Sequence, residues 1–236
     1  MCGRASQYSE AADVRKQFGL AAGAEIPNTP ARYNAAPRQS LLVVRHDRAA
    51  ASLIATVMRW GLVPAWAKDP KIGDRAINAR DVDPDGRTID MKPMFRDAWR
   101  TGRRCIVPLN SFFEWKAAGK LKQPYAIGMS DRSLVGAAGL WETWRDTVSG
   151  EVVLSFTIIT TAANDAVKPI HDRMPVIIGP DDYECWLAGD RTDAGCLLRP
   201  CPPEWLRVWP VSTRINKVGD VDDASCVEEI ESLSSG

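Results

Sequence analysis

The sequence predicts an α+β fold, in which a single β-rich domain of mainly antiparallel strands carries short helices on its outside. Apolar and β-branched runs of strand length recur along most of the chain, and turns rich in Gly, Pro, Asn and Asp separate them. Segments with helical spacing are few and brief. With 236 residues, 45% of them hydrophobic, the chain is long enough to bury a sizeable core.

The first quarter of the chain is expected to contain one helix and one strand pair. Ser9 precedes a short segment that ends at Gly19, as a capped helix would. The apolar runs 41–45 and 53–58 predict two paired strands, joined by a polar turn that contains His46.

Two tryptophans follow, around a Gly and a Pro that predict a loop. Trp60 is expected to pack in the core. Trp66 leads into a polar segment and is expected to remain exposed, where an aromatic ring beside basic residues could stack on nucleic-acid bases. Helical spacing over residues 94–99 predicts a short helix that ends near Gly102.

The rest of the chain is expected to be mostly strands. A helical turn at Asn164, a strand at 176–178 and a capped helix at 180–187 are expected near its end. The strands expected before them cover residues 104–108, 112–115, 123–130, 133–145 and 151–161.

Charge is balanced overall but unevenly distributed. The net charge of zero argues against indiscriminate nucleic-acid binding. Residues 66–122 nevertheless carry 13 Lys and Arg against 8 Asp and Glu, whereas residues 181–236 carry 5 against 12. A local positive face or simply uneven solvated charge would both explain this pattern. We expect one domain, residues 1–218, and an acidic disordered tail, residues 219–236.

Composition also predicts a cytoplasmic protein without a cofactor. No apolar run is long enough to span a bilayer, and the start of the chain lacks a signal-peptide pattern. Six cysteines without a Cys-x-x-Cys pair, together with two histidines, support neither a disulfide framework nor a metal site. We expect no membrane contact and a monomer.

The start of the chain, Met1-Cys2-Gly3-Arg4, suggests a specific chemistry. If Met1 is removed, Cys2 presents a free α-amine next to its thiol. The amine can form an imine with an aldehyde, and the thiol can close onto the same carbon to give a thiazolidine. Both groups ionise near neutral pH in model peptides, so little tuning is expected. Alternatively, Cys2 is an ordinary residue.

Two further residues are candidates for proton transfer. Glu114 lies among three aromatic residues, and burial there would raise the pKa of its carboxyl toward neutrality. Alternation along a strand could instead direct it to water. His171 stands beside Asp172 and Arg173, where it is either a held catalytic base or a satisfied polar residue.

Several blocks together resemble the SOS response-associated peptidase family, in the family's order and over residues 2–218. They are Met1 to Arg4, Tyr33 to Pro37, Trp60 to Trp66, Asn78 to Arg80, Arg104 to Pro108, Phe113 to Trp115 and His171 to Pro175. The resemblance implies a barrel-like body with peripheral helices. It also implies a role in the DNA damage response.

The chemistry implied by the resemblance is a covalent crosslink between the protein and abasic sites in single-stranded DNA. Cys2 would be the nucleophile through its amine and thiol, and the Asn78 amide would orient it. Glu114 would transfer protons during imine formation and ring closure, and His171 would assist opening of the sugar. Removal of Met1 could be self-catalysed, which would make the protein a hydrolase or protease, and an abasic-site lyase activity would be compatible.

The resemblance also implies DNA contacts. Arg4 and Arg80 would bind phosphates beside the lesion, Asn34 would shape the loop near the site, and Trp66 would stack where a duplex meets a single strand. The sequence departs from the family at two positions. Val82 replaces a common acidic residue, and Ser111 replaces a glycine.

Two other functions fit the same residues. An N-terminal nucleophile peptidase would use Cys2 to cleave other proteins, with its own α-amine as the base. A non-catalytic module would bind single-stranded DNA without needing Cys2.

Overall fold

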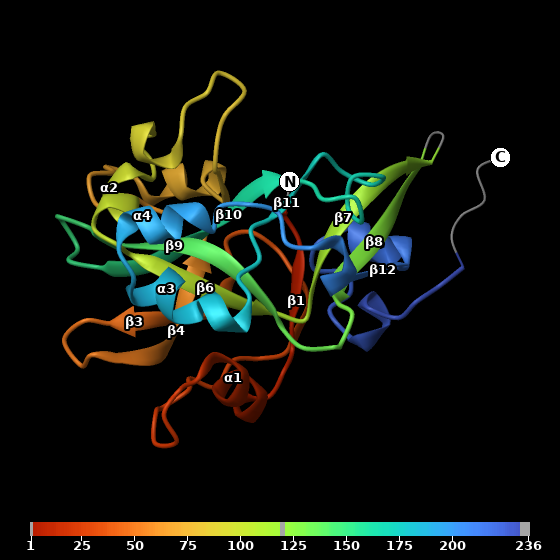
Figure 1. Ribbon diagram of the computed structural model, residues 1–236, viewed down its shortest axis with the longest axis horizontal. Coiled ribbons are helices and arrows are strands. Elements are labelled where there is room, and N and C mark those ends of the chain that lie inside the picture. The colour runs from red at the N-terminus through yellow and green to blue at the C-terminus, as the bar shows by residue number, and fades with distance from the viewer. Residues whose placement is uncertain (1, 119–120, 232–236) are drawn as a thin grey trace.

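A closed barrel of five strands forms the larger part of the protein (Figure 1). The computed structural model describes residues 2–118 and 121–231. The barrel strands are β3 (Ser40–Asp47), β4 (Ser52–Trp60), β6 (Arg104–Leu109), β9 (Val135–Arg145) and β10 (Val152–Ala162). Neighbours run antiparallel except β10 and β4, which are parallel, and β9 pairs with β10 to close the ring. Closure leaves these strands without a free edge. The predicted β-rich, barrel-like α+β fold is confirmed.

A second, antiparallel sheet stands beside the barrel, to its right in Figure 1. Its strands, in spatial order, are β12 (Leu206–Pro210), β8 (Leu121–Met129), β7 (Ser111–Ala118), β1 (Ala5–Gln7) and β2 (Arg32–Ala35). The red strand β1 lies between the barrel and strands β7, β8 and β12 in the picture. The first strand of the chain is therefore an interior strand, paired on both sides.

Two short strands extend the barrel at the end of β10. β5 (Asn78–Arg80) runs parallel to residues 158–160 of β10, and β11 (Arg173–Pro175) runs antiparallel to residues 160–162. These pairings bring two distant segments of the chain to the same end of one strand.

The core fills the barrel and the space between the two sheets. All six residues of β6 are buried, as expected for a strand covered on both faces. Trp60 is fully buried, stacks on Phe156 with ring centroids 6.2 Å apart, and donates its indole N–H to the Ile77 carbonyl. The predicted core position of Trp60 is confirmed.

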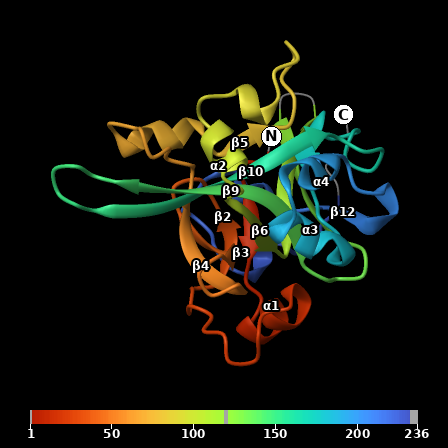
Figure 2. The same cartoon turned by 60° about the vertical axis from the view of Figure 1, so that its left-hand side comes forward.

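Four short α-helices lie outside the barrel, visible at different sides in Figures 1 and 2. They are α1 (Ala11–Phe18), α2 (Arg96–Arg100), α3 (Tyr183–Ala188) and α4 (Arg191–Cys196). The described 3-10 turns are Pro70–Arg75, Ile89–Met91, Pro180–Asp182, Pro203–Trp205, Thr213–Asn216 and Ala224–Cys226. No helix in the described part of the chain is both long and apolar enough to cross a bilayer.

Some local predictions were wrong. Ser9 does not cap α1: the N-cap is Glu10, and the Ser9 hydroxyl instead accepts a hydrogen bond from the Asn110 amide. His46 lies within β3, opposite Leu53, rather than in the turn. The strand expected at 176–178 is found instead at 173–175, as β11, where it pairs with β10. Residues 176–178 form only an isolated bridge, between Ile177 and Ala137 of β9.

The C-terminal segment is more ordered than its composition suggested. Val221, Cys226 and Val227 pack on the second sheet, around Phe113. Asp222 accepts hydrogen bonds from the backbone amides of Tyr33 and Asn34, which are donors on the outer edge of β2. Disorder starting at residue 219 was therefore the wrong prediction for this segment; residues 232–236 lie outside the described residues.

Replacing Asp222 should test this edge contact. Asp222→Ala removes the acceptor of two backbone amides, and hydrogen bonds to a charged group are worth about 1.5–3 kcal/mol each when buried. Because these are partly exposed, we expect a loss of about 1–2 kcal/mol in the free energy of unfolding, measured by denaturant titration. Asp220→Ala is the control, since its ion pair with Lys217 is a surface i,i+3 contact. Equal losses in the two variants would contradict the proposed role of Asp222.

Candidate active site

Pairing of the N-terminal strand places Cys2 next to Glu114. Ala5 lies opposite Phe112, and the Phe113 amide donates to the Arg4 carbonyl at 2.9 Å. The two segments are antiparallel, so residues before Arg4 run along β7 toward Glu114. Cys2 is fully buried there, within the apolar cluster of the barrel.

The thiol of Cys2 is held in its neutral form. Burial raises the pKa of the Cys2 thiol well above its usual range, and the nearby carboxylate of Glu114 raises it further. The backbone N–H of Arg4, which is directed at the thiol, acts in the opposite direction. The expectation that this thiol needs little tuning is therefore wrong. It needs a neighbouring base before it can act as a nucleophile.

Asn78 fixes the backbone of residue 2 from the barrel side. Its side-chain Nδ2 donates a hydrogen bond to the Cys2 carbonyl at 2.8 Å. Asn78 is the first residue of β5, which is held in parallel register by Ile158 of β10. The contact therefore joins the N-terminal segment to the barrel at the end of β10.

Glu114 projects from β7 into the protein, with 3% of its side chain exposed. Burial raises the pKa of this carboxyl, and His171 opposes that rise. Of the two orientations that the sequence left open, the structure shows the buried one. A carboxyl with a raised pKa can both accept and return a proton near neutral pH.

His171 faces Glu114 from the segment that leads into β11. The His171 Nε2 atom lies 3.9 Å from Glu114 Oε2. The Arg173 backbone N–H donates to His171 Nδ1 at 3.0 Å, which places the proton of the neutral ring on Nε2, toward Glu114. The exposed Asp172 carboxylate also lies 2.9 Å from His171 Nδ1.

Cys2 and the three polar residues near it form a candidate acid/base site. Cys2, Asn78, Glu114 and His171 come from four segments that the two sheets bring together. Among the residues that the structure describes, no three His, Cys, Asp or Glu side chains are grouped so that they could hold a metal ion. The arrangement provides a buried thiol, a buried carboxyl with a raised pKa, and a half-buried imidazole.

Comparison with known proteins agrees with this arrangement. A family model described as SOS response associated peptidase (SRAP) matches residues 1–218. The chain belongs to the SRAP family. The abasic site processing protein YoqW of Bacillus subtilis (strain 168) is 38% identical over 220 residues, which are 92% of this chain and 94% of YoqW.

More distant relatives also match over nearly the whole of this chain. The abasic site processing protein HMCES of Xenopus tropicalis is 28% identical over 252 residues, covering 92% of this chain and 75% of HMCES. A crystal structure of a protein from Bacteroides thetaiotaomicron matches this SRAP chain with a TM-score of 0.84 and 26% identity. That match covers 97% of this chain and 100% of the other.

Arg4 and Asn34, which were predicted to lie at the DNA interface, are both buried in this SRAP protein. The Arg4 guanidinium donates to Asn34 Oδ1 at 2.7 Å and to the Ile215 carbonyl, and it lies over the Trp115 ring. Asn34 is 2% exposed and donates to the Val221 carbonyl. In this geometry Arg4 and Asn34 hold the N-terminal strand in place through buried hydrogen bonds. The Arg4 guanidinium does not point out toward a phosphate.

Trp66 and Arg80 are placed differently from that buried pair. Trp66 is 50% exposed in the loop after β4, which confirms its predicted position outside the core. Arg80 is half-buried at the end of β5, two residues beyond Asn78. Trp66 is therefore on a loop, whereas Arg80 is on a short strand that is paired with β10 of the barrel.

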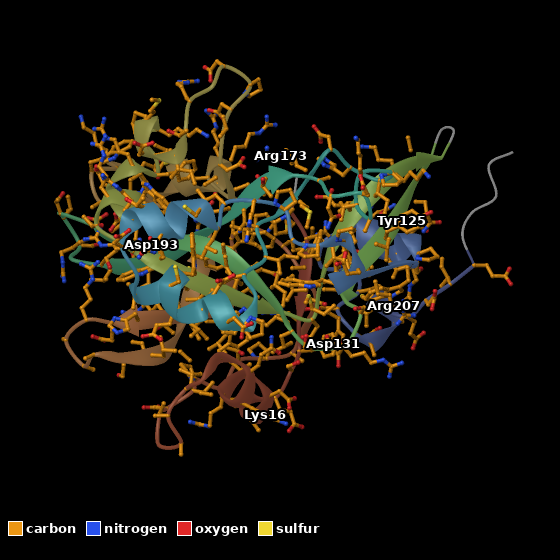
Figure 3. All side chains as sticks on the ribbon, viewed as in Figure 1. Lys16, Tyr125, Asp131, Arg173, Asp193 and Arg207 are labelled. Carbon is orange, nitrogen blue, oxygen red and sulfur yellow. The ribbon has the colours of Figure 1, made fainter. Side chains whose placement is uncertain are left out.

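The sequence reasoning missed an ion pair that joins β5 to β11. Arg173 donates from Nη2 to Asp81 Oδ1 at 2.8 Å and also to the Thr160 carbonyl of β10. Figure 3 shows Arg173 near the end of the β10 ribbon. Asp81 directly follows Arg80 in the sequence, but Arg173 is remote from it along the chain, and the pair meets only because β5 and β11 both bind β10.

The two departures from the family pattern have local explanations. Val82 is 45% exposed and forms a single β-bridge with Thr88, so it has no polar role. The hydroxyl of Ser111 is buried within 2.7 Å of the Ser6 hydroxyl, so the added polar group has a partner. Neither change touches the four residues of the acid/base site.

Burial of Glu114 predicts a pH-dependent stability. Below the pKa of an unfolded glutamate, about 4.3, the carboxyl is protonated in both states and burial of its charge costs nothing. As pH rises, the unfolded state ionises first, and stability falls until the raised pKa of the folded state is passed. Glu114→Gln removes this loss. The melting temperature of the variant minus that of the wild type should therefore be more positive at pH 8 than at pH 4.

Glu204→Gln serves as the control, because Glu204 is an exposed carboxylate. Its melting temperature should follow that of the wild type at both pH values. A Glu114→Gln difference that is constant with pH, or larger at pH 4, would contradict the direction of the Glu114 pKa shift.

Proposed function

We propose that this protein recognises abasic sites in single-stranded DNA and crosslinks covalently to the opened sugar through Cys2, shielding the lesion during the DNA damage (SOS) response. The names of relatives such as YoqW and HMCES support the coarser statement, that the protein processes abasic sites. The observation that carries the finer proposal is the meeting of Cys2, Asn78, Glu114 and His171 around one thiol.

The first step is opening of the sugar, because the closed ring has no aldehyde. The anomeric hydroxyl loses a proton, the bond from the anomeric carbon to the ring oxygen breaks, and the ring oxygen gains a proton. His171 would move these protons, since its Nε2 points toward Glu114 and its Nδ1 is held by the Arg173 amide.

The second step forms an imine. Removal of Met1, which we propose to be self-catalysed, frees the α-amine of Cys2. The amine adds to the aldehyde carbon, and the resulting carbinolamine loses water. The hydrogen bond from Asn78 to the Cys2 carbonyl would hold residue 2 during this addition. Strand cleavage by a lyase reaction would also start from this imine.

The third step closes the thiazolidine ring. A carbon–sulfur bond forms, the thiol proton passes to Glu114, and the imine nitrogen receives a proton. One water is released overall and no oxidation state changes. Because burial raises the pKa of the Cys2 thiol, loss of its proton to bulk water is disfavoured, and an adjacent carboxylate is required. The raised pKa of Glu114 then allows the proton to be returned.

DNA contact would come from two other residues. Arg80 would pair with phosphate oxygens beside the lesion, and exposed Trp66 would stack on the last base pair where a duplex meets the single strand. Arg4 and Asn34 would hold the N-terminal strand. Binding through phosphates should weaken with salt, and the protein would be found on DNA when lesions are present.

Cys2→Ala provides the direct test. We expect this variant to lose the denaturant-stable adduct with an abasic oligonucleotide, detected by gel electrophoresis and intact mass spectrometry. Reversible binding should change less than about threefold, because no phosphate contact is removed. Cys196→Ala, which changes an exposed free cysteine, is the matched control and should form the adduct normally. An adduct that persists in Cys2→Ala would refute the covalent mechanism.

Glu114→Gln should separate chemistry from binding. The amide keeps the shape of the carboxyl but cannot accept the thiol proton, so we expect adduct formation to slow by about 10²–10⁴-fold. DNA affinity should remain close to that of the wild type. Single-turnover rates measured over pH 5–9 would check this. If the rates and their pH profile are unchanged, Glu114 is not the proton carrier.

A further inference from the structure

The loop that carries Trp66 rests on the long hairpin formed by β9 and β10. Figure 2 shows this hairpin projecting well beyond the barrel. Val63 and Ala67 of the loop form a small apolar cluster with Trp144 of β9, and Ile72 and Val153 pack against it. The cluster is separate from the barrel core and lies under the loop.

The first part of the loop is fixed by its backbone. The Gly61 amide donates to the Phe156 carbonyl at 2.8 Å, and the Val63 amide donates to the buried Ser155 hydroxyl at 2.8 Å. Gly61 has a φ of 126°, and a Cβ there would lie 2.6 Å from the Gly73 carbonyl oxygen. A side chain at this position would therefore clash with the Gly73 backbone in this loop conformation.

The tip of the loop is held by Trp144. Trp144 is 3% exposed, and its indole N–H donates to the Ala67 carbonyl at 2.7 Å. Ala67 directly follows Trp66, whose ring is half exposed. The buried indole of Trp144 therefore fixes the backbone directly beside the exposed indole of Trp66. A tryptophan N–H in the interior needs such a partner, and its loss would leave a buried carbonyl unsatisfied.

We propose that Trp144 is a positioning residue for DNA recognition, which holds Trp66 in the orientation needed to stack on a duplex end. This rests on the proposed function of Trp66. The hairpin of β9 and β10 then has a second role besides closing the barrel. It positions Trp66 relative to the candidate active site, which lies at the other end of β10. Trp144 touches neither the DNA nor the reacting atoms.

The test uses Trp144→Phe, which keeps an aromatic ring in the cluster and removes the N–H. The matched control is Trp141→Phe on the same strand, whose ring contacts Arg45 and packs against the barrel core instead of belonging to the cluster under the loop. Reversible affinity would be measured in a Cys2→Ala background, for an abasic single strand and for the same strand ending in a duplex. Adduct rates at saturating DNA would be measured with Cys2 intact.

We expect Trp144→Phe and Trp66→Ala each to weaken binding to the junction by about tenfold, the size expected for one lost base–aromatic stack. Affinity for the plain single strand and the maximal adduct rate should stay within about twofold. The double variant should bind no more weakly than Trp66→Ala alone, because Trp144 acts only through Trp66. Trp141→Phe should match the wild type.

Three results would overturn the proposal: junction affinity unchanged in Trp144→Phe, additive losses in the double variant, or a wild type that does not prefer the junction. The first two results concern Trp144 alone, whereas the third would overturn the proposed stacking role of Trp66 as well. All three are distinct from failure of the proposed crosslinking, in which the wild type would form no adduct with any abasic DNA. If Trp144→Phe does not fold, the same comparison would use 3-benzothienylalanine at position 144, which keeps the bicyclic ring and replaces only the N–H.

Discussion

Pairing of the first strand with β7 is the constraint on which the site depends. β1 has only three residues, yet it is hydrogen-bonded on both sides, to β2 and to β7. A register shift of one residue would turn Cys2 away from Glu114, since successive side chains of a strand point to opposite faces. The buried contacts of Arg4 with Asn34 and Ile215 oppose such a shift. A residue near a chain terminus is thereby held as firmly as one in the core.

Burying Cys2 and Glu114 side by side has an electrostatic cost, and the same pKa shifts suit the proposed chemistry. Burial disfavours the charged forms of both Cys2 and Glu114, and each charge disfavours the other. Only one proton has to move between them for the thiol to attack. In a low-dielectric site, the free energy of this proton transfer depends strongly on other nearby polar groups. His171, whose Nε2 lies 3.9 Å from Glu114, is close enough to influence it. A site built in this way is less stable than an apolar core would be, which is common where chemistry occurs.

Sequence patterns predicted the parts of this protein that depend on local or periodic signals. Runs of apolar residues predicted the strands, and the difference between Trp60 and Trp66 followed from their neighbours along the chain. The pattern could not say that Arg4 is buried, because its partners Asn34 and Ile215 are remote in sequence. Acidic composition likewise suggested a disordered tail, although the specific contact of Asp222 with the β2 edge orders that segment.

β10 explains how remote segments cooperate in one site. Its edges receive β9 and β4 near one end, and β5 and β11 near the other. Asn78 and Arg173 are therefore fixed to one half of β10. The other half of β10 holds the loop before Trp66, through Ser155 and Phe156. The ion pair of Arg173 with Asp81 ties both short strands to each other as well as to β10. Because both ends of β10 hold these segments, a tilt of this strand would move the backbone anchor of Cys2 and the loop before Trp66 together. Under the proposed function, β10 would therefore set the spacing between the reacting carbon and the duplex end.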